Sequence, residues 1–151
     1  MKNWRFGINK IVTLHFQIQL GMKMFKPEIF WLKGKVAHGY ANGRTFGYPT
    51  ANLTDIQPII PFAAGVYAAW VQYGGMQYGA MMYVGTRPTL ALTGTTVEIH
   101  IFDFQQDIYD KEIEFAIIKK IREEKRFESI NALTAQLQED ERTIRKLMNE
   151  G

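Results

Sequence analysis

The chain has no cysteine, which excludes disulfide bonds and thiolate metal sites and is compatible with a reducing compartment. It also lacks an apolar run of the roughly 18 residues that a membrane-spanning helix needs. A secretory signal is not expected, because His15, Gln17 and Gln19 interrupt the apolar residues near the start. We therefore expect a cytoplasmic protein without a membrane partner.

Acidic residues are in the minority, with 15 Asp and Glu against 18 Lys and Arg and a formal net charge of +3. The basic excess lies at the N-terminal end. Residues 1–35 hold seven basic residues and Glu28 as their one acid, a net charge of +6, so residues 36–151 carry −3. Since a nucleic-acid-binding domain needs a basic patch on the fold itself, we expect no nucleic-acid partner.

The length predicts a single domain. A chain of 151 residues, 46% of them hydrophobic, has enough apolar material for one core. Residues 1–27 show only partial alternation of apolar side chains, and we interpret them as an N-terminal extension or linker. The folded domain is then expected over residues 28–151.

Short strands dominate the middle of the chain. Gly74 and Gly75 separate two aromatic-rich runs, which is a β-hairpin signal, whereas Pro58 and Pro61 predict an irregular connection after Leu53. Such strands with Gly and Pro turns indicate an all-β barrel or sandwich. The predicted strands are residues 30–38, 65–73, 76–85, 96–104 and 112–121.

The C-terminal part changes to helical periodicity. Ser129 is a suitable N-cap residue, and the apolar side chains that follow it recur on one helical face, with charges elsewhere. We expect one amphipathic helix packed against the β structure. The apolar residues of this face are Ile130, Leu133, Leu137, Ile144 and Leu147.

A Gly-rich stretch at residues 38–53 reads HGYANGRTFGYPTANL. Gly39, Gly43 and Gly47 recur every four residues, and glycine lets the backbone approach a ligand closely, so the loop could cradle phosphates. The stretch matches neither GxxxxGK[ST] nor GxGxxG. Its composition alone is a weak signal.

Five ordered motifs make the signal specific. They are PTAN at 49–52, GVYA at 65–68, VGTRPT at 84–89, VEIHIFDF at 97–104 and IRxExxF at 121–127. Together they resemble the riboflavin kinase family from about Leu32 to Asp140. The resemblance implies a six-stranded antiparallel Greek-key barrel with a C-terminal helix. It also implies transfer of the γ-phosphoryl group of ATP to the 5′-hydroxyl of riboflavin, giving FMN and ADP.

Two further expectations follow from the resemblance. In bacteria the kinase module usually follows a nucleotidyltransferase domain, and no part of this chain resembles one, so we expect that the chain alone does not make FAD. We also expect a monomer whose partners are riboflavin and ATP. The alternative is a non-catalytic flavin- or nucleotide-binding barrel with a regulatory role.

Glu98 is the predicted general base. The two-residue period of a strand points it away from Val97 and Ile99, and a carboxylate among strand apolar residues is unusual because unpartnered burial is costly. Without the resemblance, the simpler interpretation is that Glu98 is an exposed strand residue. The match to the family's glutamate in VExH assigns it the role of accepting the hydroxyl proton.

The resemblance assigns Thr50 and Asn52 to Mg²⁺ and the nucleotide phosphates. Their i, i+2 spacing places both oxygens on one side of an extended segment, and Mg²⁺ prefers hard oxygen ligands together with ATP phosphates. The alternative is a turn in which Asn52 bonds its own backbone.

The resemblance assigns the rest of the Gly-rich stretch to ATP as a flap. Ala41 and Asn42 stand where Gly and Arg are frequent in the family, and since the loop length is kept we expect altered nucleotide affinity rather than loss of function. The predicted ATP-binding residues are Gly39, Gly43, Arg44, Thr45, Gly47 and Pro49.

Arg122, in IREEKRF, matches a family arginine near the flavin. The alternative, to which we give equal weight, is that Arg122 is a solvated charge beside Glu123 and Glu124. His100 lies on the same strand face as Glu98, and we interpret it as a hydrogen-bonded structural histidine, since no partner shows convincing metal-ligand spacing with it.

Overall fold

The computed structural model describes residues 28–38, 47–59, 61–88 and 93–150. The chain divides into two compact units, Met1–Phe30 and Trp31–Gly151. Every described strand and helix lies in the second unit. The predicted extension at 1–27 lies outside the described residues, as do residues 39–46, which make up half of the Gly-rich stretch.

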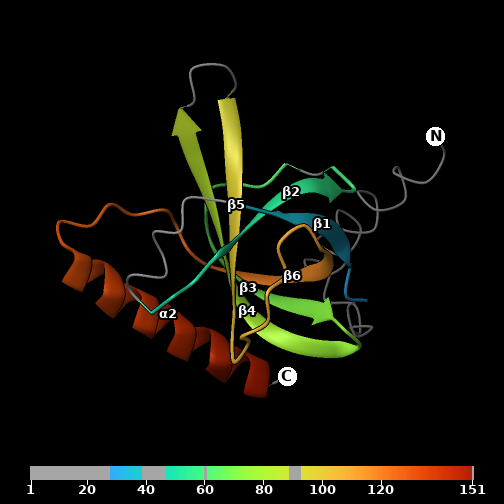
Figure 1. Ribbon diagram of the computed structural model, residues 1–151. Helices are drawn as coiled ribbons and strands as arrows, with labels where there is room; N and C mark the ends of the chain where they lie inside the picture. Colours follow the sequence, from blue (N-terminus) through green and yellow to red (C-terminus); the bar gives the residue numbers. More distant parts are fainter. Residues whose placement is uncertain (1–27, 39–46, 60, 89–92, 151) are drawn as a thin grey trace, which may run out of the picture. The chain divides into compact units, whose positions relative to one another are not determined.

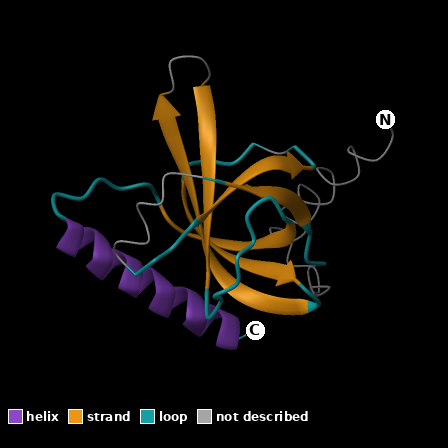
Figure 2. Cartoon of the chain, in the orientation of Figure 1, coloured by secondary structure: helices purple, strands orange, loops and turns teal. Residues whose placement is uncertain are grey.

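Six antiparallel strands form a closed barrel with the neighbour order β1-β2-β5-β4-β3-β6 (Figures 1 and 2). Strands β3, β4 and β5 are consecutive neighbours, and β6 returns to lie beside β3, which is a Greek-key arrangement. The predicted all-β Greek-key barrel is therefore confirmed. The strands are β1 (Leu32–Ala37), β2 (Ala51–Gln57), β3 (Gly65–Tyr73), β4 (Met76–Pro88), β5 (Thr93–Ile101) and β6 (Glu112–Arg122).

The β3–β4 hairpin has the predicted turn. Tyr73 pairs with Met76 across Gly74 and Gly75, whose φ angles of 59° and 77° require a left-handed backbone that glycine adopts without strain. Strands β4 and β5 continue past the rest of the barrel as a long hairpin (Figure 1). Strand β4 therefore runs further than its predicted end at Gly85.

Strand β2 corrects the prediction of an irregular connection after Leu53. The strand continues to Gln57, because β1 pairs with it as far as that residue, whereas its pairing with β5 ends at Leu53. Its register against β1 shifts beside Asp55, which has a φ of 51°, so a bulge interrupts the alternation from which a strand would be predicted.

The barrel interior holds the main core. Val97, Ile99 and Ile101 alternate inward along β5, and Phe115 of β6 is fully buried among them. Gly65, the first residue of GVYA, fits tightly at the barrel wall. It has a φ of 149°, and a Cβ added there would lie 2.7 Å from the Arg122 carbonyl oxygen, so no other residue fits without strain.

One helix, α2 (Ile130–Asn149), packs on the outside of β4 and β6. It begins at Ser129, whose side chain accepts a hydrogen bond of 3.1 Å from the Ala132 backbone N–H, which confirms the predicted cap. Ile144 is fully buried, whereas Ile130 in the first turn is 59% exposed, so the apolar face starts later than predicted. Among the described residues, no helix is both long and apolar enough to cross a membrane.

Candidate active site

Asn52 and Glu98 face each other across neighbouring strands. Asn52 of β2 is the register partner of Glu98 of β5, and the flanking pair is Leu53 with Val97. Leu53 and Val97 point into the core, so Asn52 and Glu98 lie on the outer face, where opposed Cβ atoms are about 5 Å apart. The structure thus brings together the predicted base and a predicted metal ligand.

The surroundings of these two residues bear on the simpler alternatives to their predicted roles. Asn52 lies in a regular strand and not in a turn, which excludes the alternative interpretation. Glu98 is half-buried and has Tyr83 of β4 as its register partner on the other side. It is therefore not a fully exposed strand residue.

His100 holds the segment that precedes β2. Its Nδ1 lies 2.7 Å from the Pro49 carbonyl oxygen, and a protonated Nδ1 donates a hydrogen bond to it. The ring of Tyr48 packs edge-on against His100 with 5.1 Å between centroids. The prediction of a hydrogen-bonded structural histidine is confirmed, and its partner is the residue before Thr50.

A cavity of about 300 Å³ opens beside Thr50. Its apolar wall comes from the barrel interior and its polar wall from the loop between β5 and β6, while Glu98 is absent from its lining. Sequence reasoning did not find this loop as part of the site. The lining residues are Val36, Pro49, Thr50, Ala51, Ile99, Ile101, Phe104, Gln105, Gln106, Asp107, Ile108 and Tyr109.

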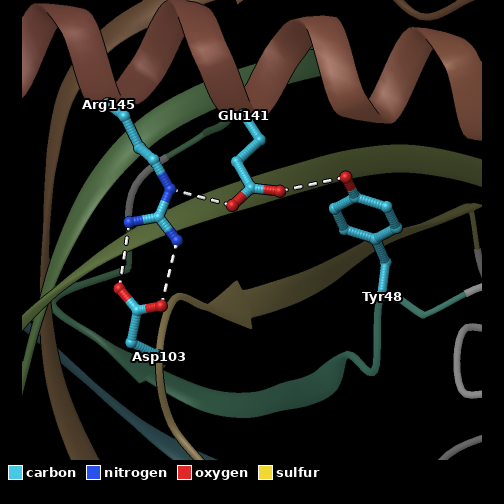
Figure 3. A network of polar contacts seen from close by, with 4 residues as sticks. All are labelled: Tyr48, Asp103, Glu141 and Arg145. Carbon is cyan, nitrogen blue, oxygen red and sulfur yellow. Dashed lines mark hydrogen bonds and ion pairs between the residues drawn. The ribbon is translucent and has the colours of Figure 1, made fainter.

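A polar network joins Tyr48 to α2 (Figure 3). The Tyr48 hydroxyl donates to Glu141 Oε2 at 2.9 Å, and Arg145 Nε donates to Glu141 Oε1 at 2.8 Å. The two terminal nitrogens of Arg145 donate to both carboxylate oxygens of Asp103, at 2.9 and 3.2 Å. Arg145 also stacks over the Phe102 ring, 4.6 Å from its centroid. Only the fold reveals this network, because no sequence signal links α2 to the Gly-rich stretch.

The network shifts three pKa values. Burial, followed by the hydrogen bond to Glu141, raises the pKa of Tyr48 to about 12. The hydrogen bond and positive charge of Arg145 lower the pKa of the exposed Asp103. Hydrogen bonds to Asp103 and Glu141 raise the pKa of Arg145. All three residues therefore keep their ordinary charge state at neutral pH.

Arg122 is engaged with α2. Its Nε donates to both oxygens of Asp140 at 3.0 and 2.9 Å, and its terminal nitrogens reach Asp140 and the Glu123 carbonyl oxygen. The Asp140 side chain is 2% exposed and that of Arg122 is 19% exposed. Arg122 is thus an anchor of the helix and not a solvated charge, and its flavin role stays a prediction.

Thr50 and Asn52 could bind Mg²⁺ only together with phosphate oxygens, because they supply too few ligands by themselves. Within the described ranges, no group of three or more His, Asp and Glu side chains could hold a metal ion. Thr50 and Asn52 offer one hydroxyl and one amide oxygen, which are hard ligands of the kind that Mg²⁺ accepts alongside substrate phosphates and water.

Of the Gly-rich stretch, the structure describes His38 and residues 47–53. Gly39, Gly43, Arg44 and Thr45 lie outside the described residues, so their ATP role stays a prediction. Gly47 is exposed with a φ of 78°, a backbone conformation that favours glycine, and it directly precedes the buried Tyr48.

Comparisons with known proteins agree on one family. A family model described as riboflavin kinase matches residues 27–148. The bifunctional riboflavin kinase/FMN adenylyltransferase of Escherichia coli K12 is 40% identical over 118 residues, covering 78% of this chain and 37% of that protein. The chain therefore spans less than half the length of the curated relatives that it matches.

Two solved structures share the fold. A chain described as a macrolide-efflux protein from Streptococcus pneumoniae is 39% identical, with a TM-score of 0.71, over 78% of this chain and 38% of that one. Riboflavin kinase from Trypanosoma brucei is 23% identical, with a TM-score of 0.59, over 85% of this chain and 82% of that one. The second likeness supports the fold alone.

Proposed function

The chain belongs to the riboflavin kinase family, and we propose that it transfers the γ-phosphoryl group of ATP to the 5′-hydroxyl of riboflavin, giving FMN and ADP. The observation that carries the proposal is the pairing of Asn52 with Glu98 across β2 and β5. Flavin or nucleotide binding alone needs no carboxylate beside a phosphate-binding position. The pairing therefore favours catalysis over the regulatory barrel.

Glu98 accepts the proton of the 5′-hydroxyl in this proposal. The alcohol oxygen forms a bond to the γ-phosphorus, the bond from phosphorus to the β–γ bridging oxygen breaks, and ADP leaves with that electron pair. A carboxylate can serve because it needs only to lie within hydrogen-bond reach of the attacking hydroxyl.

Thr50 and Asn52 would hold Mg²⁺ together with the ATP phosphates. The bound ion would supply positive charge that offsets the charge on the phosphates during transfer. The two side chains fix the terminal phosphate next to Glu98, because Asn52 faces Glu98 and Thr50 lies two residues earlier on the same chain segment.

The cavity beside Thr50 is the proposed nucleoside site. Pro49 and Thr50 line it, so a nucleotide whose phosphates reach Thr50 extends into the cavity with its ribose and base. Glu98 lies outside the lining, which leaves the opposite side of the terminal phosphate open to the alcohol. The two substrates thus approach from different directions.

The remaining predicted contacts complete the proposal. The Gly-rich flap would cover the nucleotide and exclude water, which would otherwise be phosphorylated in place of the alcohol. Arg122 would contact the flavin through the exposed part of its side chain. The predicted monomeric state and the absence of a nucleic-acid partner belong to the same proposal. The flap residues are Gly39, Gly43, Arg44, Thr45 and Gly47, and Pro49 is a further predicted ATP-binding residue.

The test is FMN formation by the purified chain. Riboflavin is incubated with Mg·ATP, and FMN is resolved from riboflavin by chromatography. FMN produced by the wild type supports the kinase. Riboflavin binding without FMN formation favours the non-catalytic barrel and overturns the proposal.

A further inference from the structure

We infer that Glu141 of α2 is a positioning residue for the phosphate and metal site, acting through the Tyr48 hydroxyl that it binds. The inference rests on the proposed function, because it takes Thr50 and Asn52 as the groups that receive Mg·ATP.

Tyr48 lies at the boundary between the Gly-rich stretch and β2. Gly47, with its φ of 78°, directly precedes it, and Pro49, whose ring restricts φ, follows it. Tyr48 is 9% exposed and belongs to the apolar cluster that α2 covers. Its position therefore sets where the backbone enters Thr50.

Two elements hold this segment from different sides. On the β5 side, His100 contacts the Pro49 carbonyl oxygen and packs against the Tyr48 ring. On the α2 side, the Glu141 carboxylate accepts a hydrogen bond of 2.9 Å from the Tyr48 hydroxyl, and the Glu141 side chain is 25% exposed. A hydrogen bond to a charged acceptor is stronger than one between neutral groups, so the α2 contact is the stronger anchor for the phenol.

Glu141 is itself held in place. Arg145, one turn later on α2, binds its other carboxylate oxygen and reaches both oxygens of Asp103, just past the end of β5 (Figure 3). The helix thus joins the start of β2 to the end of β5. These two strands carry Asn52 and Glu98 and already pair with each other, so the network adds a second connection between them, at the segment that enters Thr50.

The experiment compares Tyr48→Phe and Glu141→Ala with Glu139→Ala. Glu139 is an exposed carboxylate on the same helix, paired only with Arg142 among the described contacts, and makes a matched control. Affinities for Mg·ADP and for metal-free ADP are measured by titration calorimetry. We expect Tyr48→Phe and Glu141→Ala each to weaken Mg·ADP binding about tenfold, the size of coupling within one hydrogen-bond network, with a smaller change for metal-free ADP.

A conservative variant and a double variant separate positioning from general stability. Glu141→Gln keeps an oxygen that can accept a hydrogen bond from the Tyr48 hydroxyl but loses the charge, so it should recover part of the Mg·ADP affinity. Tyr48→Phe combined with Glu141→Ala should bind no more weakly than either single variant. Helix docking itself survives these changes, because Ile144 and the Arg122–Asp140 pair also anchor α2.

Unchanged Mg·ADP affinity in Tyr48→Phe and Glu141→Ala, even with a lowered unfolding midpoint, would overturn the inference and leave the network a purely structural role. An equal loss for Mg·ADP and metal-free ADP would overturn it as well. The proposed function fails separately, if the wild type binds Mg·ADP and riboflavin but forms no FMN. The affinity comparison remains decisive in that case.

Discussion

Asn52 of β2 lies directly opposite Glu98 of β5, although the two residues come from strands that are not consecutive in the chain. Both are half-buried on the outer face of the barrel, while their neighbours Leu53 and Val97 fill its core. The proposed base and a proposed metal ligand therefore share one rigid sheet surface. Sites built on strands hold their geometry better than sites built on loops.

Glu98→Gln should lower kcat for FMN formation by about 10²–10⁴, the usual contribution of a general base, with little change in riboflavin binding. The amide keeps the size of the side chain but cannot accept the proton at neutral pH. Initial rates under saturating substrates and a riboflavin titration measure the two effects. Glu114→Gln, a half-buried surface carboxylate on β6, is the matched control. Equal rates for Glu98→Gln and the wild type would remove Glu98 from its role.

Asn52→Ala should raise the Mg²⁺ concentration needed for half-maximal rate, because it removes one of two protein oxygens next to the phosphates. The measurement is FMN formation over a Mg²⁺ titration at fixed ATP. Thr54→Ala, two residues further along the same strand, serves as the control. An Asn52→Ala enzyme with unchanged activity and metal dependence would contradict the assignment.

Asp140→Ala should reduce the free energy of unfolding by about 3 kcal/mol, because it leaves the mostly buried Arg122 without its counter-charge. Urea unfolding measures the loss. Asp140→Asn and Arg122→Lys, assayed at low temperature where both are folded, then address the flavin. A raised KM for riboflavin in Arg122→Lys alone supports direct contact, whereas equal values in both variants restrict Arg122 to anchoring α2.

Asp103→Asn should lower the unfolding midpoint at neutral pH and lose that effect in acid. The folded-state pKa of Asp103 is lowered from 3.8, so its contribution is fully present above pH 3.8 and disappears as the pH falls through the lowered value. Thermal unfolding of both proteins between pH 7 and pH 2 measures the gap. If the difference in unfolding midpoint between Asp103→Asn and the wild type stays constant down to the lowest pH, the ion pair with Arg145 is not the cause of that difference.

Tyr48→Phe should show the opposite pH dependence. The pKa of Tyr48 is raised from 10.0 to about 12, so its contribution is present below pH 10 and is lost as the pH rises through the raised value. The difference in unfolding midpoint between Tyr48→Phe and the wild type should therefore close on the alkaline side. A difference that widens above pH 10 would contradict the assigned hydrogen bond to Glu141.

Local sequence patterns determined much of the fold. The limits of β3 match the prediction, the Gly74-Gly75 turn and the Ser129 cap are where the residues place them, and β5 alternates as expected. Each of these features is set by residues that are close together in the sequence. The strand follows from a period of two, the turn from glycines that adopt a positive φ, and the helix start from a capping oxygen. The ordered motifs likewise identified the family before any fold was known.

Only the tertiary structure decided which of those residues meet. Strand β2 was missed past Leu53 because its bulge breaks the alternation, and its pairing partners lie far away in the chain. The Tyr48–Glu141 bond joins residues 93 positions apart, and both this bond and the Arg122–Asp140 pair depend on docking of α2. The cavity beside Thr50 depends on closure of the barrel. The register between strands that are not consecutive in the chain follows from the packing of the whole core. A repeat of apolar residues within one segment does not determine that register.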